Sequence, residues 1–272
     1  MKPVAFAYAR PASVGEAAQM LAAEPGAKVL AGGQTLGPIL NLRLAQPTLI
    51  VDIARIPELA AVGQDADGAT IGATVTHAAI EDGRVPDPTG GFLARVARGI
   101  AYRAVRTRGT IGGSLAHADP AADWLSCLSA LGAQVSITGA TGTRSLGLDG
   151  FVRGAMETAL AKDELVTAVR IPRFSSRARF GFHKICRKTG EFAEAIAVVA
   201  YDPERAFYRA VAGATNGRPL VMALRAGVDG AKPFSVTDAE HMLQSMRYAG
   251  DAYDRKLHAA ALRRASELAF AP

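Results

Sequence analysis

Two pairs of consecutive glycines in this sequence are each followed by small polar residues. Gly32-Gly33 precedes Gln34 and Thr35, and Gly112-Gly113 precedes Ser114. Glycine reaches positive φ and lets the backbone approach a ligand, so such segments can direct several N–H groups at one anion. A single pair is weak evidence in a chain with 28 glycines, but two similar segments favour a diphosphate site. Neither has the GxGxxG or GxxxxGK[ST] pattern, which argues against Rossmann and P-loop folds.

The residue types that usually bind metals are few and poorly spaced. Cys127 and Cys186 lack the CxxC spacing of zinc and iron–sulfur sites, and we expect both to be buried thiols. His77 and His117 have no second ligand at HExxH-like spacing. We therefore predict no metal site in this chain and assign no catalytic residue.

Three further features have structural and functional interpretations. Asp123 lies at a predicted helix start, where carboxylates are favoured by exposed N–H groups and the helix dipole. Trp124 is expected to be a packing or interface residue. Three arginines precede the second glycine segment and either meet a partner or are solvated, with solvation preferred; they are Arg103, Arg106 and Arg108.

The elements before the first glycine pair are a helix and a strand. Ser13 and Glu16 have the spacing of a capping box, and the apolar spacing that follows predicts a helix over residues 14–24. A short strand over residues 28–30 then leads into the glycine segment, and a second strand follows over residues 48–53. The first glycine turn is thus expected at a strand end on a rigid scaffold.

The rest of the chain is predicted to contain mostly strands, with a boundary between two domains. A helix near residues 92–100 precedes the second glycine turn, and the polar stretch 173–179 reads as a linker after a strand over 165–172. Beyond it, an antiparallel sheet backed by helices is expected. The remaining predicted strands cover residues 70–75, 134–138, 143–146, 180–187, 195–201 and 206–212, and the two helices cover 236–246 and 251–268.

Composition indicates a folded protein. Of the 272 residues, 49% are hydrophobic and 21% charged, which permits a substantial core and suggests two moderate domains. No apolar run approaches the roughly 20 residues needed to span a bilayer, so we expect a cytoplasmic protein without membrane contact. The formal charge of +6 comes from scattered basic residues without an aromatic stacking platform, which argues against nucleic acid binding.

Two longer segments carry a resemblance to a known family. Residues 31–43 (AGGQTLGPILNLR) and 110–123 (TIGGSLAHADPAAD) resemble the two flavin signatures of the medium subunits of the xanthine dehydrogenase and carbon monoxide dehydrogenase family. The resemblance covers nearly the whole chain. It implies an α+β protein: a two-lobed FAD-binding domain of the vanillyl-alcohol oxidase (PCMH) type over residues 1–174, with lobes of about 1–54 and 55–174, and a small C-terminal domain over 175–272.

The resemblance also implies a set of cofactor-binding residues. Two groups should wrap the FAD diphosphate, Asp123 should accept a hydrogen bond from a sugar or ribityl hydroxyl, and Val166 and Lys184 should lie against the isoalloxazine ring. For Lys184, a solvated strand residue is the alternative. The residues implied at the diphosphate are Ala31, Gly32, Gly33, Gln34, Thr35 and Leu36 in the first group, and Thr110, Ile111, Gly112, Gly113 and Ser114 in the second.

Three residues depart from the family pattern. Gln34 stands where some members have histidine, and Ser114 stands where asparagine is common, so hydrogen bonds to the flavin are expected to differ. Glu191 replaces a frequent aspartate, and we assign it no role. None of these changes removes the diphosphate site.

The family implies that this chain supplies only FAD to a larger oxidoreductase. A large subunit with a molybdopterin cofactor and a small subunit with two [2Fe–2S] clusters would complete a dimer of heterotrimers, and electrons would leave to an external acceptor. One alternative is a self-sufficient FAD-dependent reductase of the same superfold, similar to UDP-N-acetylenolpyruvoylglucosamine reductase. Another is a flavin-free assembly scaffold.

Overall fold

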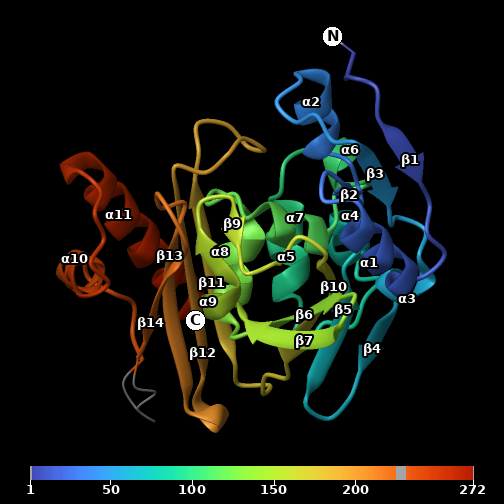
Figure 1. Ribbon diagram of the computed structural model, residues 1–272. Coiled ribbons are helices and arrows are strands. Elements are labelled where there is room, and N and C mark those ends of the chain that lie inside the picture. The colour runs from blue at the N-terminus through green and yellow to red at the C-terminus, as the bar shows by residue number, and fades with distance from the viewer. Residues whose placement is uncertain (1, 225–230, 272) are drawn as a thin grey trace.

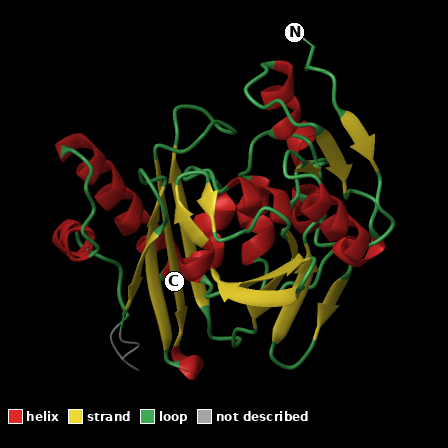
Figure 2. Ribbon diagram, in the orientation of Figure 1, coloured by secondary structure: helices red, strands yellow, loops and turns green. Residues whose placement is uncertain are grey.

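The computed structural model describes residues 2–224 and 231–271 and has an α+β fold (Figure 1). Three larger sheets are separated and covered by helices (Figure 2). A pair of C-terminal helices covers one face of a four-stranded sheet, and central helices separate its other face from a five-stranded sheet. A small parallel sheet lies near the N-terminus. The mixed α+β fold expected from the sequence is confirmed.

The N-terminal sheet is parallel, with strand order β1-β3-β2. Helix α1 (Val14–Ala23) begins after Ser13, whose hydroxyl accepts a hydrogen bond from the Glu16 N–H at 3.2 Å. The predicted helix 14–24 is therefore confirmed, and its buried apolar face packs against β3 and β6. The other elements of this region are β1 (Ala7–Ala9), β2 (Lys28–Leu30), α2 (Leu36–Asn41), β3 (Leu49–Asp52) and α3 (Pro57–Ala60).

The five-stranded sheet is antiparallel, with the order β4-β5-β10-β6-β7. Its central strand β10 pairs with β5, which precedes the second glycine segment in the chain, and with β6, which follows it. The predicted strand over 70–75 ends earlier, because the chain turns at Gly72 and Thr76 caps the next helix through the Ala79 N–H. The strands are β4 (Val62–Gln64), β5 (Gly68–Gly72), β6 (Gln134–Gly139), β7 (Gly142–Gly147) and β10 (Leu165–Pro172).

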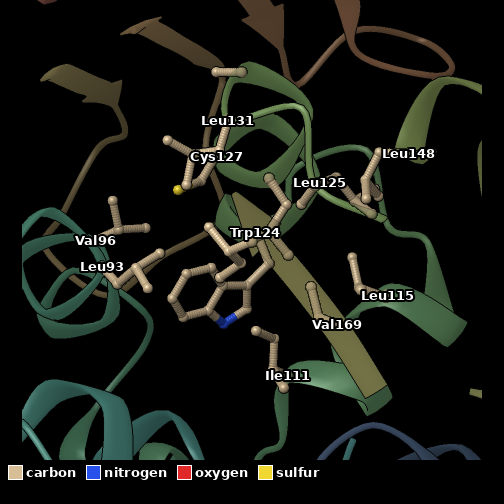
Figure 3. Packing of buried hydrophobic residues seen from close by; sticks show 14 of the residues in the cluster. Leu93, Val96, Ile111, Leu115, Trp124, Leu125, Cys127, Leu131, Leu148 and Val169 are labelled. Atoms are coloured by element: carbon tan, nitrogen blue, oxygen red, sulfur yellow. The ribbon is translucent and has the colours of Figure 1, made fainter. Parts of the chain in front are cut away.

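The central helices form the main core around Trp124, which is fully buried among apolar residues (Figure 3). Trp124 is a packing residue, as the sequence predicted. Burying a large apolar side chain stabilises the folded state by roughly 1.5–3 kcal/mol relative to exposure. The helices are α4 (His77–Glu81), α5 (Phe92–Arg98), α6 (Arg103–Arg106), α7 (Ile111–His117), α8 (Asp123–Ala130) and α9 (Leu148–Phe151), followed by the ribbon β8 (Val152–Gly154) and β9 (Glu157–Thr158).

The C-terminal sheet is antiparallel, in the order β11-β12-β13-β14. Every residue of β12 is buried, because α8 packs on one face of the sheet and α11 on the other. This explains why the run 195–201 is continuously apolar. The elements are β11 (Arg179–Ile185), β12 (Ala195–Asp202), a 3-10 turn (Pro203–Arg205), β13 (Phe207–Gly213), β14 (Leu220–Ala223), α10 (Val236–Ser245) and α11 (Ala252–Ala269).

The stretch 173–179, expected as a polar linker, connects β10 to β11 but is packed into the structure. The ring of Phe174 meets the rings of Phe180 and Phe207 edge-on, with centroids 5.0 and 5.4 Å apart. The N–H and hydroxyl of Ser175 donate to the carboxylate of Asp202 at 2.7 and 2.6 Å. The connection between the central core and the C-terminal sheet is therefore an ordered, packed segment.

Candidate cofactor site

The two glycine segments, far apart in the sequence, are in backbone contact. A Cβ atom on Gly32 would lie 1.9 Å from the carbonyl oxygen of Arg108 and 3.0 Å from Cα of Gly109. Only glycine fits so close an approach, because any side chain would meet rigid main-chain atoms. The fold thus brings the first segment against the residues that open the second.

The first segment is a turn between β2 and α2. Gly33 has a φ of 73°, in the left-handed region that favours glycine. Within the described chain, the N–H groups of residues 32–35 donate no hydrogen bond, while these residues remain at least partly exposed. Neighbouring unpaired N–H groups at a glycine turn form an anion-binding concavity. These groups fit the diphosphate of FAD, which is the anion that the sequence predicted here.

The second segment differs from the predicted glycine turn, because α7 begins at Ile111. The hydroxyl of Thr110 caps this helix by accepting from the Gly113 N–H at 3.1 Å. The N–H groups of Ile111 and Gly112 donate to the carbonyls of Val75 and Ala73 at 3.0 and 2.9 Å. These three N–H groups are satisfied within the protein, so they are not the unpaired donors that we expected. The role of residues 110–114 in FAD binding stays a prediction.

A close approach explains the first glycine of the second pair. A Cβ on Gly112 would lie 2.5 Å from Cβ and 2.8 Å from Cα of Ala73. Gly113 is exposed, and a Cβ there would meet mainly the Thr110 hydroxyl, at 2.8 Å. The side chain of Ser114 lies one residue further along the same helix and is half-buried. Gly112 therefore serves packing, and the surface of this segment is formed by Gly113 and Ser114.

A buried histidine supports the junction of the two segments. The N–H of His77 donates to the Gly109 carbonyl at 2.9 Å, and the indole N–H of Trp124 donates to Nδ1 of His77 at 3.0 Å. Burial first, and the nearby Arg106 guanidinium second, lower the pKa of His77 to about 4. His77 is thus neutral near pH 7, which leaves Nδ1 able to accept. Sequence reasoning missed this pair, because its partners are far apart in the chain.

Lys184 and Asp123 meet each other at the boundary between α8 and the C-terminal sheet. The ammonium of Lys184 donates to Oδ1 of Asp123 at 2.8 Å and to the carbonyl of Gly99 at 2.8 Å. Their side chains are only 10% and 9% exposed, so a solvated Lys184 is wrong. Burial raises the pKa of the Asp123 carboxyl, and the adjacent ammonium opposes that shift. The expected contacts of both residues with FAD stay predictions.

Val166, the remaining predicted ring contact, lies in β10. It is 4% exposed and is paired with Ile137 of β6, just before an irregularity in the ladder. Its side chain belongs to the main core. A contact between Val166 and the flavin ring also stays a prediction.

Not all of the arginines before the second segment are solvated. Arg106 is buried and donates to Glu81 at 2.7 Å and to the carbonyls of Ile100 and Ala101 at 2.8 and 3.0 Å. Arg103 pairs with Glu81 and Asp82 at 2.6 and 2.7 Å. These bonds fix the chain between α5 and α6. Arg103 and Arg108 are exposed, so the expectation of solvated arginines is wrong only for Arg106.

The two cysteines have different environments. Cys127 is fully buried in the core, and burial raises the pKa of its thiol well above the usual range. Cys186, at the end of β11, is half-buried, so the expectation of two buried thiols is wrong for this residue. The strand ends there, which leaves its side chain at the rim of the sheet.

The candidate FAD site at residues 32–35 and 110–114 is recognised from its backbone conformation and unpaired N–H groups, and not from a cavity. Two cavities of about 400 and 320 Å³ lie instead at the C-terminal sheet and its connections. No helix in residues 2–224 and 231–271 has the length and apolar character required to cross a membrane.

Unpaired backbone donors at a left-handed glycine turn, held against a second segment, are typical of a protein that binds an anionic cofactor. The family described as FAD binding domain in molybdopterin dehydrogenase matches residues 4–174. The chain belongs to this family, and its cofactor is FAD. It is a flavoprotein subunit of the molybdenum hydroxylase type and an oxidoreductase, as the sequence resemblance indicated.

Individual relatives support the assignment. The chain is 37% identical over 200 residues to the nicotine 6-hydroxylase medium subunit of Paenarthrobacter nicotinovorans, covering 73% of this chain and 70% of that protein. A structure of carbon monoxide dehydrogenase from Hydrogenophaga pseudoflava matches with a TM-score of 0.86 and 31% identity, over 100% of this chain and 99% of that one. Quinoline 2-oxidoreductase from Pseudomonas putida 86 matches with a TM-score of 0.85 and 31% identity, over 99% and 98%.

Proposed function

We propose that this chain is the medium subunit of a heteromeric molybdenum hydroxylase, taking electrons from a partner's [2Fe–2S] clusters and passing them to an external acceptor. The observation that carries the proposal is the contact of Gly32 with Arg108, which places the unpaired N–H groups of the first turn beside the second segment. Bound FAD supplies the chemistry, because a flavin can accept electrons singly and release them in pairs.

The residues of this chain bind and orient the cofactor. The N–H groups of residues 32–35 would hold the diphosphate, since its charge requires neighbouring donors. Gln34 in the first turn and Ser114 in α7 offer further hydrogen-bonding groups. Asp123 and Lys184 form a polar pair at the start of α8, where the flavin hydroxyls and ring would lie. The carboxylate of Asp123 also faces the positive end of that helix.

The relatives' printed names support the partners. One is a medium subunit, and a matching structure is of a Cu,Mo-CO dehydrogenase. We therefore propose a large molybdopterin-binding partner and a small partner with two [2Fe–2S] clusters, assembled as a dimer of heterotrimers. Mass measurement of the native complex tests this stoichiometry. A cytoplasmic location also stays a prediction, which cell fractionation tests.

We also propose that the chain divides near residue 174 into an FAD-binding part and a C-terminal part. The family match ends at residue 174, and β10 ends at Pro172. The C-terminal sheet has its own second core with α10 and α11. Limited proteolysis under partly denaturing conditions, followed by mass spectrometry of the fragments, tests this boundary.

The flavin site is tested by Gly33→Val and Gly113→Val. At Gly33 the positive φ excludes a β-branched residue, and at Gly113 the new side chain would crowd the Thr110 cap. We expect each variant to lose most of its FAD, measured by flavin absorbance per chain. The control is Gly63→Val. Gly63 lies in the exposed strand β4, and no atom lies within 4 Å of the position that its Cβ would take. Full flavin occupancy in both site variants would contradict the proposed site.

A further inference from the structure

A second candidate site lies away from the glycine segments, in a cavity of about 320 Å³. One strand and two loops surround it. They are β8, the loop from β13 to β14, and the loop from α10 to α11. Each contributes one arginine to the lining, namely Arg153, Arg218 and Arg247. Among the residues that the structure describes, the lining contains no aspartate or glutamate.

These three arginines line one cavity and have no acidic partner among the described residues. All three are exposed, and within the described residues none is within 4.0 Å of a carboxylate oxygen. Guanidinium groups gathered around one cavity repel one another unless an anion lies among them. Their positions therefore favour a negatively charged ligand.

Three carboxylates, those of Asp251, Asp254 and Glu157, lie close in the sequence to lining residues, and none of them forms an ion pair with the three arginines. Asp251 caps α11 by accepting from the Asp254 N–H at 2.9 Å. Burial, followed by the charges of Asp254 and Asp251, raises the pKa of Tyr248, which lines the cavity, and the charge of Arg255 opposes that shift. A carboxylate oxygen of Glu157 lies near Gly154, yet it forms no ion pair with Arg153.

The loop from β13 to β14 adds main-chain donors. Thr215 fixes its shape by donating a hydrogen bond from its hydroxyl to the Arg218 carbonyl at 2.9 Å. The N–H of Ala214 donates to the carbonyl of Pro120 at 3.0 Å, which anchors the loop to the segment before α8. In the part of the chain that the structure describes, the N–H groups of residues 216–218 make no hydrogen bond. They are available to a ligand in the cavity.

We propose that this cavity binds a small phosphate-bearing anion. Planar guanidinium groups bind phosphate oxygens through paired, charge-assisted hydrogen bonds, and unpaired N–H groups add donors of the same polarity. The cavity accommodates a phosphate group with a small organic substituent. The proposal is independent of the flavin site, because none of the residues assigned to FAD lines this cavity.

The test uses the FAD-loaded complex in phosphate-free buffer. Inorganic phosphate, pyrophosphate and AMP serve as probes, and isothermal titration calorimetry measures their affinity. We expect saturable binding, weakened about tenfold by Arg218→Ala or Arg247→Ala, the size expected for losing a charge-assisted hydrogen bond. The control is Arg177→Ala, which removes an exposed arginine from the connection between β10 and β11 and should leave the affinity unchanged. FAD content should stay constant in all variants.

Two results distinguish the possible ligands, and two would overturn the site. Tighter binding of AMP than of inorganic phosphate would identify an organic phosphate, whereas equal binding would identify free phosphate; either supports the site. No saturable binding of any probe at millimolar concentration would overturn it. An equal loss of affinity in Arg177→Ala would show that net charge alone attracts the probes.

Discussion

At the residue scale, the pairing of Lys184 with Asp123 changes what the lysine is expected to do. A solvated lysine would act on the flavin as an isolated charge, but this ammonium is held by a buried carboxylate and by the Gly99 carbonyl. Removing one partner of a buried ion pair leaves an uncompensated charge and typically costs about 3–5 kcal/mol. Lys184 therefore contributes to the junction of α8 with the C-terminal sheet as well as to the proposed flavin environment.

Lys184→Met should lower the two-electron potential of bound FAD, because a cation near a flavin stabilises its reduced anionic form. We expect a fall of tens of millivolts, with about 30 mV corresponding to roughly 1.4 kcal/mol, measured by redox titration. The variant should also melt at a lower temperature. The double variant Lys184→Met, Asp123→Asn should recover part of this stability, because no buried charge is then unpaired. An unchanged potential with FAD fully bound would limit Lys184 to a structural role.

His77 should make stability depend on pH. Its pKa is lowered to about 4 in the folded protein from a usual value of 6.5, so the unfolded chain binds the extra proton first as pH falls. Stability should therefore decrease from about pH 6.5 down to about pH 4, by at most about 3 kcal/mol from this residue. Denaturant titrations at several pH values measure the effect. In His77→Gln the decrease should be smaller over that window; the same slope in both proteins would contradict this assignment.

At the element scale, the sequence predicted the longer helices and most strands but missed the short ones. Helix α1 and strand β12 follow from a capping serine and a continuous apolar run, which are local signals. Short helices such as α4 and α6 depend on tertiary contacts, so their patterns are too brief to recognise. The second glycine pair was predicted as a turn because the helix capped by Thr110 contains two glycines, which disfavour helices.

The site was predictable only in part for the same reason. The glycine pairs predict a close approach of the backbone to other atoms, but the sequence does not show whether those atoms belong to a ligand or to the protein itself. A Cβ on Gly32 or Gly112 would meet backbone atoms of another segment of this chain. Among the four glycines of the two pairs, Gly33 alone has a positive φ. The Trp124–His77 hydrogen bond joins residues from two elements, and no periodicity or motif encodes such a pair.

Gly32→Ala should destabilise the protein as well as weaken FAD binding. The added methyl group would lie 1.9 Å from a carbonyl oxygen, so one backbone segment must move, at a cost of about 1–3 kcal/mol. Thermal unfolding and flavin absorbance per chain measure both effects. The matched control is Gly15→Ala in α1, where nothing lies within 4 Å and alanine should be neutral or stabilising by up to about 1 kcal/mol. Equal melting temperatures in the two variants would refute the close approach.

At the scale of the whole molecule, the central helices connect the parts. Helix α8 packs against the C-terminal sheet, begins with Asp123, and carries Trp124, which reaches His77 behind the glycine segments. One short helix thus joins the proposed diphosphate end of the site to the C-terminal sheet. The segment before α8 is also linked to the arginine-lined cavity, because the carbonyl of Pro120 accepts from the N–H of Ala214, next to Thr215 in the cavity lining.

The most direct test of the account is the flavin content of the purified native complex. Unpaired N–H groups at the first glycine turn predict a cofactor held through its diphosphate without a covalent bond. We expect one FAD per copy of this chain, and acid precipitation should release it into the supernatant, where chromatography identifies it. Yellow colour that remains with the precipitated protein, release of FMN instead of FAD, or a complex without flavin would contradict the proposed site.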